Sequence, residues 1–155
     1  MTLALTNLEI TPERGNAALL PNQPILHGCK VYASQSGTLV PGDVVALATG
    51  GSADLIEVKK AAVTDEPIGV VVGNPIKTGW VAGERISVFP VGSYVYMPGG
   101  AASIARGSKL QFNTDGEVLA TSTATYGYVG IAMTAGVAKG DLIVVQIKPA
   151  VEPAS

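Results

Sequence analysis

Short stretches in which apolar and polar residues alternate recur along most of the chain, and glycine or proline residues separate them. The alternation has a period of two, which places every second side chain on one face of a β-strand. The stretches are "DVVAL" (43–47), "IGVVV" (68–72), "RISVF" (85–89), "SYVYM" (93–97), "KLQF" (109–112), "YVGIAM" (128–133) and "DLIVVQI" (141–147). Short strands divided by turns predict an all-β fold, and we expect a small β-barrel or β-tulip-like domain.

Helical periodicity is absent from residue 28 onward, where no segment of helical length repeats its apolar residues every 3.6 positions. One place could hold a single helical turn, near Lys59 to Val63 in "IEVKKAAVTDEP". Pro67 would end any longer helix there, because proline lacks the backbone N–H that a helix needs.

Four phrases repeat one pattern: a glycine, a polar residue directly after it, and apolar residues three and five positions after it. They are "VPGDVVAL", "VAGERISVF", "IARGSKLQF" and "VAKGDLIVVQI", aligned on Gly42, Gly83, Gly107 and Gly140. Glycine readily adopts backbone angles that other residues avoid, and a polar neighbour can bond the free amides of a turn. Each phrase therefore predicts a tight structural turn that leads into a strand.

A second element, "PIGVVV" at 67–72 and "YVGIAM" at 128–133, lies between the phrases of each pair. The order turn-strand, strand, turn-strand thus occurs twice, which favours two similar halves, 38–91 and 102–147, related by a pseudo-two-fold, over a chance match in a glycine-rich chain. "ISVFPVGSYVYMPGG" is expected to join the halves. "FNTDGEVLA" predicts a hairpin with Asp115-Gly116 as its two-residue turn.

The ends of the chain differ from this body, which we place at 28–148. Residues 1–27 have scattered apolar side chains and prolines, and they predict an extended N-terminal arm that becomes ordered against a partner. Residues 149–155 predict a flexible C-terminal tail. Candidates for a capsid or oligomer interface are Leu3, Leu5, Leu8 and Ile10 of the arm, and Trp80, the only tryptophan, which could instead fill one end of the barrel.

The composition is unusually poor in charge, with 47% apolar and 14% charged residues, against about 25% charged in a typical domain. Such a chain has little polar surface to cover itself, which favours a surface partly buried in an assembly. The net charge of −2 gives no electrostatic reason for a nucleic-acid partner, and no apolar stretch is long enough for a membrane helix. We therefore expect neither partner.

Candidate chemistry is sparse. His27 and Cys29, the single histidine and the single cysteine, are two residues apart and would point the same way on a strand, but a hinge histidine beside a buried thiol is the favoured interpretation. Two such residues cannot make a protein zinc site. The loop "GNPIKTG" (73–79) lacks the residue order of a phosphate-binding loop. We expect no catalytic residue, metal or cofactor, and an enzyme is the least favoured class.

The succession "VPGDVVAL", "PIGVVV", "VAGERISVFPVG", "ARGSKLQFNTDGEV", "YVGIAM" and "KGDLIVVQI" resembles the small capsid decoration, or cement, proteins of tailed bacteriophages and prophages, over residues 38 to 147. The resemblance implies a β-barrel body assembled in the host cytoplasm and bound to the outer surface of the mature, expanded capsid at its symmetry axes. It further implies contact with the major capsid protein, self-association as a homotrimer or a dimer, and stabilisation of the shell against internal DNA pressure. The alternatives are other virion structural proteins: a head fibre base, a tail-tube component or a host-binding spike.

Overall fold

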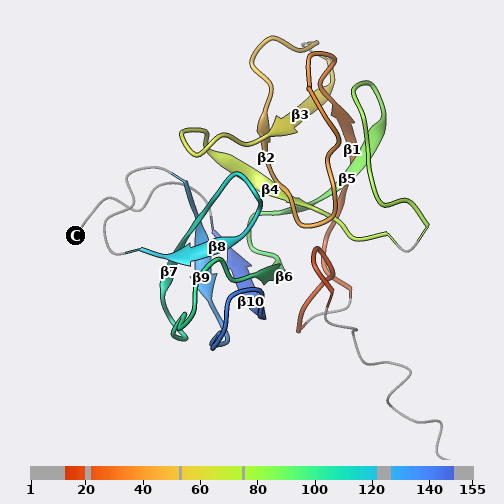
Figure 1. The fold of residues 1–155 in the computed structure, drawn as a ribbon. Coiled ribbons are helices and arrows are strands. Elements are labelled where there is room, and N and C mark those ends of the chain that lie inside the picture. Colours follow the sequence, from red (N-terminus) through yellow and green to blue (C-terminus); the bar gives the residue numbers. More distant parts are fainter. Residues whose placement is uncertain (1–12, 20–21, 53, 75, 122–126, 149–155) are drawn as a thin grey trace, which may run out of the picture.

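The computed structural model describes residues 13–19, 22–52, 54–74, 76–121 and 127–148, and within these ranges every regular element is a β-strand. This confirms the predicted all-β class. The strands form two bodies, one built from β1–β5 and one from β6–β10 (Figure 1). Their bounds are β1 Leu26–Val31, β2 Val44–Leu47, β3 Ile56–Lys60, β4 Pro67–Val71, β5 Arg85–Pro90, β6 Tyr94–Pro98, β7 Lys109–Phe112, β8 Val118–Ala120, β9 Tyr128–Ala132 and β10 Leu142–Ile147.

The first body is a closed barrel with the strand order β1-β3-β2-β4-β5. The barrel closes where β1 pairs in parallel with β3 and antiparallel with β5. Inward-facing residues of the strands form a small core together with Leu39 and Trp80, which pair with each other outside the strands. The strand residues of this core are Cys29, Val31, Val45, Val58, Val71, Ile86 and Val88. The period-two alternation in the sequence therefore separates the inside of this barrel from its outside.

The second body is a five-stranded sheet with the order β6-β10-β9-β7-β8. Reading from β8, the order β8-β7-β9-β10-β6 repeats the barrel order β3-β2-β4-β5-β1. Both bodies also have a register shift at the same place in the repeat, at Val45/Ala46 between β2 and β4 and at Leu110/Gln111 between β7 and β9. The two halves predicted from the repeated phrases thus share one topology. The chain passes from the first body to the second between the end of β5 and the start of β6.

A second and larger core is made mainly of residues of the second body and extends to the outer face of the barrel. Val44, Val70 and Phe89, which point outward from the barrel, join a cluster with Val95 and Leu110 of the sheet. All five side chains are at most 3% exposed. The outer face of β2, β4 and β5 carries apolar side chains because it packs against the second sheet.

The repeated glycines adopt nearly the same backbone angle, with φ of 84° at Gly42, 86° at Gly83, 84° at Gly107 and 92° at Gly140. In each turn the amide that follows the glycine donates to the carbonyl three residues before it, at 3.1–3.2 Å. Gly92, with φ of 95°, makes the same turn before β6, and its phrase "PVGSYVYM" is a fifth copy that the sequence alignment missed.

Two local predictions are wrong. The segment near Lys59 to Val63 begins within β3 rather than in a helical turn, because the alternation of Ile56 and Val58 with polar residues suits a strand between β1 and β2. The β7–β8 hairpin exists, but its loop is longer than Asp115-Gly116. Asn113 donates to the carbonyl of Glu117 at 2.9 Å, and Gly116 has φ of 74°, as in three-residue hairpin loops.

The described part of the predicted arm packs against its own chain. Gly15 and Ala18 donate backbone hydrogen bonds to Tyr96 and Tyr94 at 2.9 and 2.8 Å, so residues 15–18 pair with β6. The buried side chain of Gln23 bonds the backbone of Tyr94 and the carbonyl of Ala18. The physical reason is that β6 is an edge strand whose free N–H and C=O groups need partners. β1 also begins at Leu26, inside the range predicted as arm.

Candidate interaction surface

One end of the barrel carries an apolar rim, which we call the barrel mouth and define by the exposed Leu26, Leu47 and Ile56 and the half-buried Ile68. The mouth lies where β2 and β5 end and where β1, β3 and β4 begin. Leu47 and Ile56 are two positions from the fully buried Val45 and Val58, so they follow the inward-facing alternation past the end of the core. They are 51% and 47% exposed. Apolar side chains clustered in this way are typical of a surface that contacts a partner.

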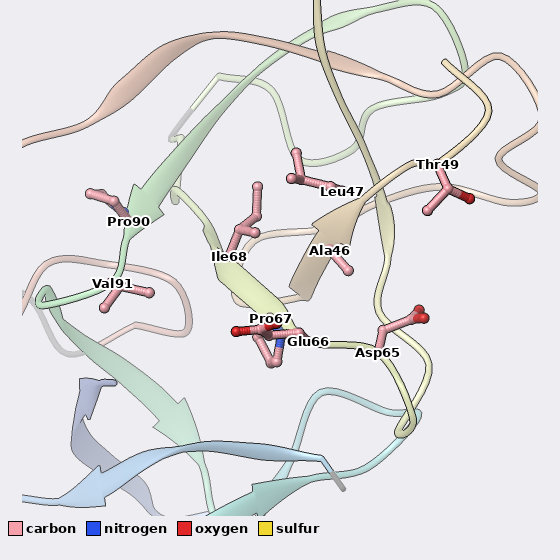
Figure 2. Close-up of a pocket in the computed structure, with 9 residues that line it drawn as sticks. All are labelled: Ala46, Leu47, Thr49, Asp65, Glu66, Pro67, Ile68, Pro90 and Val91. Atoms are coloured by element: carbon pink, nitrogen blue, oxygen red, sulfur yellow. The ribbon is translucent and has the colours of Figure 1, made fainter. Parts of the chain in front are cut away.

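A groove of about 490 Å³ lies beside the barrel mouth (Figure 2). Figure 2 shows Leu47 and Ile68 near its centre, Pro90 and Val91 to one side and Asp65 to the other. The lining residues are Ala46, Leu47, Thr49, Asp65, Glu66, Pro67, Ile68, Pro90 and Val91. The groove is therefore mainly apolar, with two carboxylates on one rim.

The rim carboxylate of Asp65 is held in its ionised form. Partial desolvation opposes ionisation, but hydrogen bonds from the Ala62 amide and the Lys59 ammonium, with the Lys59 charge, together lower the pKa of Asp65 below its ordinary value. The distance from Lys59 Nζ to Asp65 Oδ2 is 3.0 Å. Glu66 beside it is exposed, so this rim of the groove is negative.

The opposite end of the barrel presents an isolated isoleucine. Ile76 is 93% exposed, in the loop that the sequence marks as "GNPIKTG". Asn74 Oδ1 accepts hydrogen bonds from the backbone N–H groups of Ile76 and Lys77 at 2.8 and 3.1 Å, and Lys77 Nζ bonds Glu84 Oε1 at 2.8 Å. Sequence reasoning treated this segment as a connecting loop and missed Ile76, although isoleucine is an unusual residue at an exposed turn.

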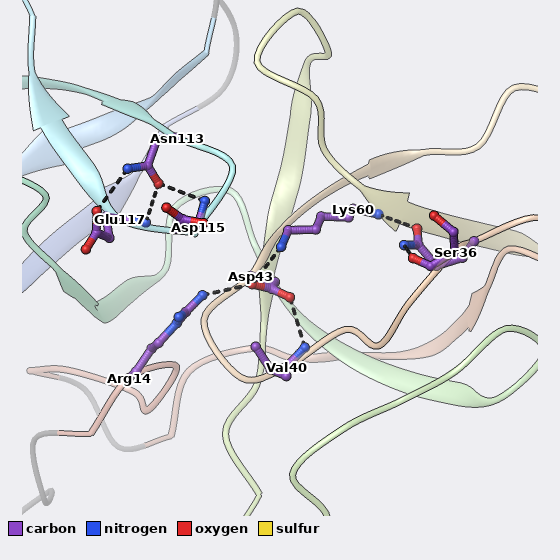
Figure 3. A network of polar contacts seen from close by, with 9 residues as sticks. Arg14, Ser36, Val40, Asp43, Lys60, Asn113, Asp115 and Glu117 are labelled. Atoms are coloured by element: carbon purple, nitrogen blue, oxygen red, sulfur yellow. Dashed lines mark hydrogen bonds and ion pairs between the residues drawn. The ribbon is translucent and has the colours of Figure 1, made fainter.

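A buried acid joins the arm to the barrel (Figure 3). Asp43 is 1% exposed, accepts from the Val40 amide at 2.9 Å and bonds Arg14 Nη2 at 2.8 Å, with Lys60 Nζ at 3.9 Å. Arg14 also lies against Gly116 of the β7–β8 loop, where any side chain would collide with the guanidinium. This cluster connects the arm, the barrel and the second body, and its contacts are those of a structural support.

The candidate residues from the sequence lie in different places. Trp80 is 6% exposed and packs in the barrel core, where its backbone pairs with Leu39, so its indole is a core side chain rather than a surface for a partner. Leu3, Leu5, Leu8 and Ile10 lie outside the described residues. Sequence reasoning missed Leu47 and Ile56, because alternation marks inward positions without showing which of them pass the end of the core.

His27 and Cys29 do not point the same way, contrary to the sequence expectation. A register shift between Leu26 and Cys29 breaks the alternation of β1. His27 is exposed with Nδ1 3.0 Å from Ser87 Oγ, whereas Cys29 is 1% exposed and burial raises the pKa of its thiol. Among the described residues, no group of three or more His, Cys, Asp or Glu side chains is placed to hold a metal ion. The same residues contain no helix that is long and apolar enough to span a membrane.

Comparison with known proteins finds similarity at the level of the fold. No protein-family model matches the chain, and no curated protein matches it in sequence. The fold is similar to the crystal structure of the head fibre gp8.5 N base of bacteriophage phi29, with a TM-score of 0.53 and 20% sequence identity. The match covers 80% of this chain and 94% of that one. The match extends over both bodies, and it shows that the two proteins have a similar fold.

Proposed function

We propose that this chain is a structural protein of a phage virion that binds the outer surface of the head. The observation that carries the proposal is the fold likeness to a head fibre base, which spans almost the whole of that protein. The low charge content and the exposed apolar barrel mouth support it, since both suit a protein that works within an assembly.

Two forms of this function share the same first step, binding to the major capsid protein. The role of a head fibre base is favoured by the structural likeness. The role of a cement protein is supported by the repeated glycine phrases of the sequence, and in that role binding across several capsid subunits would stabilise the expanded shell by mass action. Neither role needs a catalytic group.

The decisive experiment mixes the purified full chain with expanded heads of the phage that encodes it, prepared without this protein. We expect the chain to sediment with the heads, and electron microscopy to show added density outside the shell at symmetry axes. Failure to sediment with heads, or density on the tail instead, contradicts the proposal. A cement protein would also raise the temperature at which heads release DNA, whereas a fibre base would leave that temperature unchanged.

The first residues of the chain offer a second test. Gly15, Ala18 and Gln23 bond the backbone of β6. A deletion of residues 2–12 therefore removes Leu3, Leu5, Leu8 and Ile10 and leaves those contacts in place. If these side chains contact the capsid, the deletion lowers head occupancy while the thermal unfolding of the free protein stays the same. Undiminished occupancy would assign head binding to the body alone.

A further inference from the structure

We propose that copies of this chain associate head to tail, with the Ile76 loop of one copy seated in the barrel-mouth groove of the next. The loop is the segment around Asn74, Ile76 and Lys77, and the groove is the one lined by Leu47, Pro67, Ile68 and Pro90. The proposal concerns contact between copies, so it stands apart from the capsid-binding function.

The loop has the properties of a preorganised knob. Ile76 is the most exposed of the large apolar side chains in the described residues, at 93%. Two hydrogen bonds to Asn74 Oδ1 and the Lys77–Glu84 ion pair hold the backbone around it. A held loop loses little conformational freedom when it binds, so burying its isoleucine yields more net affinity than burying the same side chain on a free loop.

The groove has the matching shape and charge. Its volume of about 490 Å³ lies within the range of pockets that enclose a small ligand, so it has room for one side chain and the backbone beside it. Apolar side chains fill its centre and Glu66 lies exposed on its rim. The Lys77 ammonium next to Ile76 bonds Glu84 and its side chain is still 43% exposed, so its remaining N–H groups can bond Glu66 on the rim of a neighbouring groove.

The positions of the two features require a second copy. β4 begins in the groove at Pro67 and ends at Val71, just before the loop. The two features are therefore separated by the length of β4, about 15 Å at roughly 3.3 Å per residue, and lie at opposite ends of one barrel. A loop cannot fill the groove of its own barrel. A contact between different surfaces on two copies is heterologous, and it builds a closed ring or an open chain of copies.

Sedimentation velocity of the full chain at increasing concentration tests the proposal. We expect Ile76→Lys and Leu47→Lys each to weaken self-association about tenfold or more, because each places a charge in an apolar contact. Val137→Lys is the matched control, since Val137 is 78% exposed on a turn of the second body and should leave association unchanged. Thermal unfolding of each variant verifies that it is folded.

An equimolar mixture of Ile76→Lys and Leu47→Lys gives the sharpest result. The first variant keeps its groove and the second keeps its loop. At concentrations at which each variant alone is monomeric, the mixture should therefore form one-to-one pairs and nothing larger. A wild-type chain that remains monomeric at about 1 mM, where even millimolar contacts are populated, overturns the proposal. So does unchanged association of Ile76→Lys, an effect of Val137→Lys as large as that of Ile76→Lys, or a mixture without pairs.

Discussion

The two bodies of the molecule share one strand order but close in different ways. In the barrel, β1 and β3 pair over three residues, from Cys29↔Ile56 to Val31↔Val58. In the second body the equivalent strands, β6 and β8, meet at the single bridge Gly99↔Val118, where Gly100 donates to the carbonyl of Val118 at 2.8 Å. β6 ends at Pro98, directly before Gly99 and Gly100, and the second body is an open five-stranded sheet.

The difference in closure determines which residues form the apolar core of each body. The closed barrel encloses an apolar cluster made wholly from its own residues, whereas the apolar cluster of the open sheet also includes Val44, Val70 and Phe89 of the barrel. The same topology thus gives an independent body when it closes and a dependent one when it does not. We expect the barrel to be the more stable of the two, and the following changes test the equivalence and the difference.

The largest effect is expected at two equivalent strand glycines, Gly69 in β4 and Gly130 in β9. A Cβ atom at Gly69 would collide with the carbonyl oxygen of Phe89, and one at Gly130 with that of Gln146. Neither contact can relax without moving the paired strand, so we expect Gly69→Ala and Gly130→Ala each to cost about 3 kcal/mol in the free energy of unfolding. Urea denaturation of each variant measures this change in the free energy of unfolding.

Gly28→Ala is the control for both substitutions, because nothing lies within 4 Å of a Cβ atom at Gly28. Its unfolding free energy should change by less than about 0.5 kcal/mol. A large loss at one of the two strand glycines and none at the other would show that β4 and β9 are not structural equivalents.

A smaller effect is expected at the turns, where Asp43 of the barrel corresponds to Ser108 of the second body. Asp43→Ala removes the bond to the Val40 amide and leaves Arg14 without its partner. Arg14 is itself 31% exposed, so water compensates part of the loss, and we expect a cost of about 2 kcal/mol. Ser108→Ala should cost less than about 1 kcal/mol.

A double-mutant cycle of Arg14→Ala and Asp43→Ala separates the ion pair from the turn. If the two losses simply add, Arg14 does not support Asp43 and the cluster does not connect the arm to the barrel. Chemical denaturation of the two single variants and the double variant gives the coupling energy.

Much of this comparison could be predicted from sequence, because local chemistry encodes it. A glycine at positive φ with a polar residue after it is a local requirement of the turn, so four copies were visible in the sequence. The fifth, at Gly92, was missed because Pro90 and Val91 before it made the segment look like a continuous strand with an irregularity. β3 was missed because the lysines and alanines after Ile56 and Val58 also suit a helix.

The interaction surface could not be predicted in the same way. Leu47 and Ile56 have the same sequence pattern as buried strand residues, and their exposure depends on where the barrel ends. Trp80 shows the same limit, since a lone tryptophan after a loop suits an interface or one end of the barrel equally well in sequence, and only the structure places its indole in the barrel core. Exposure depends on the relative positions of distant strands, which local patterns do not contain.

Hydrogen exchange can measure the difference in closure directly. The amide of Gly100 bonds Val118 at the single bridge of the second body, and the amide of Tyr32 bonds Val58 at the end of the paired β1–β3 seam. We expect Gly100 to exchange at least about tenfold faster than Tyr32, since a lone bridge opens without disturbing neighbouring bonds. Equal protection at the two amides would mean that the second body is closed as firmly as the barrel.

The smallest expected effect compares two exposed turn acids, Glu84 of the barrel and Asp141 of the second body. The hydrogen bond from Lys77, with one from the Val81 amide, lowers the pKa of Glu84, whereas the amides of Ala138 and Val137 lower the pKa of Asp141. Both folded-state values lie below the unfolded ones, about 4.3 for Glu and 3.9 for Asp. The stabilisation is therefore complete above those unfolded values and is lost as pH falls through the folded ones.

The two acids should respond differently to salt, because one depends on a cation and the other on backbone amides. We expect added salt to raise the pKa of Glu84 toward its ordinary value, since ions screen the Lys77 charge, and to change that of Asp141 much less. NMR titration of the side-chain carboxyl carbons at low and high salt measures both. Asp141→Asn keeps an oxygen that can accept the two amide bonds but cannot titrate, so it should reduce the loss of stability below about pH 4. An equal salt shift at both acids would mean that the two turns are held by the same kind of contact.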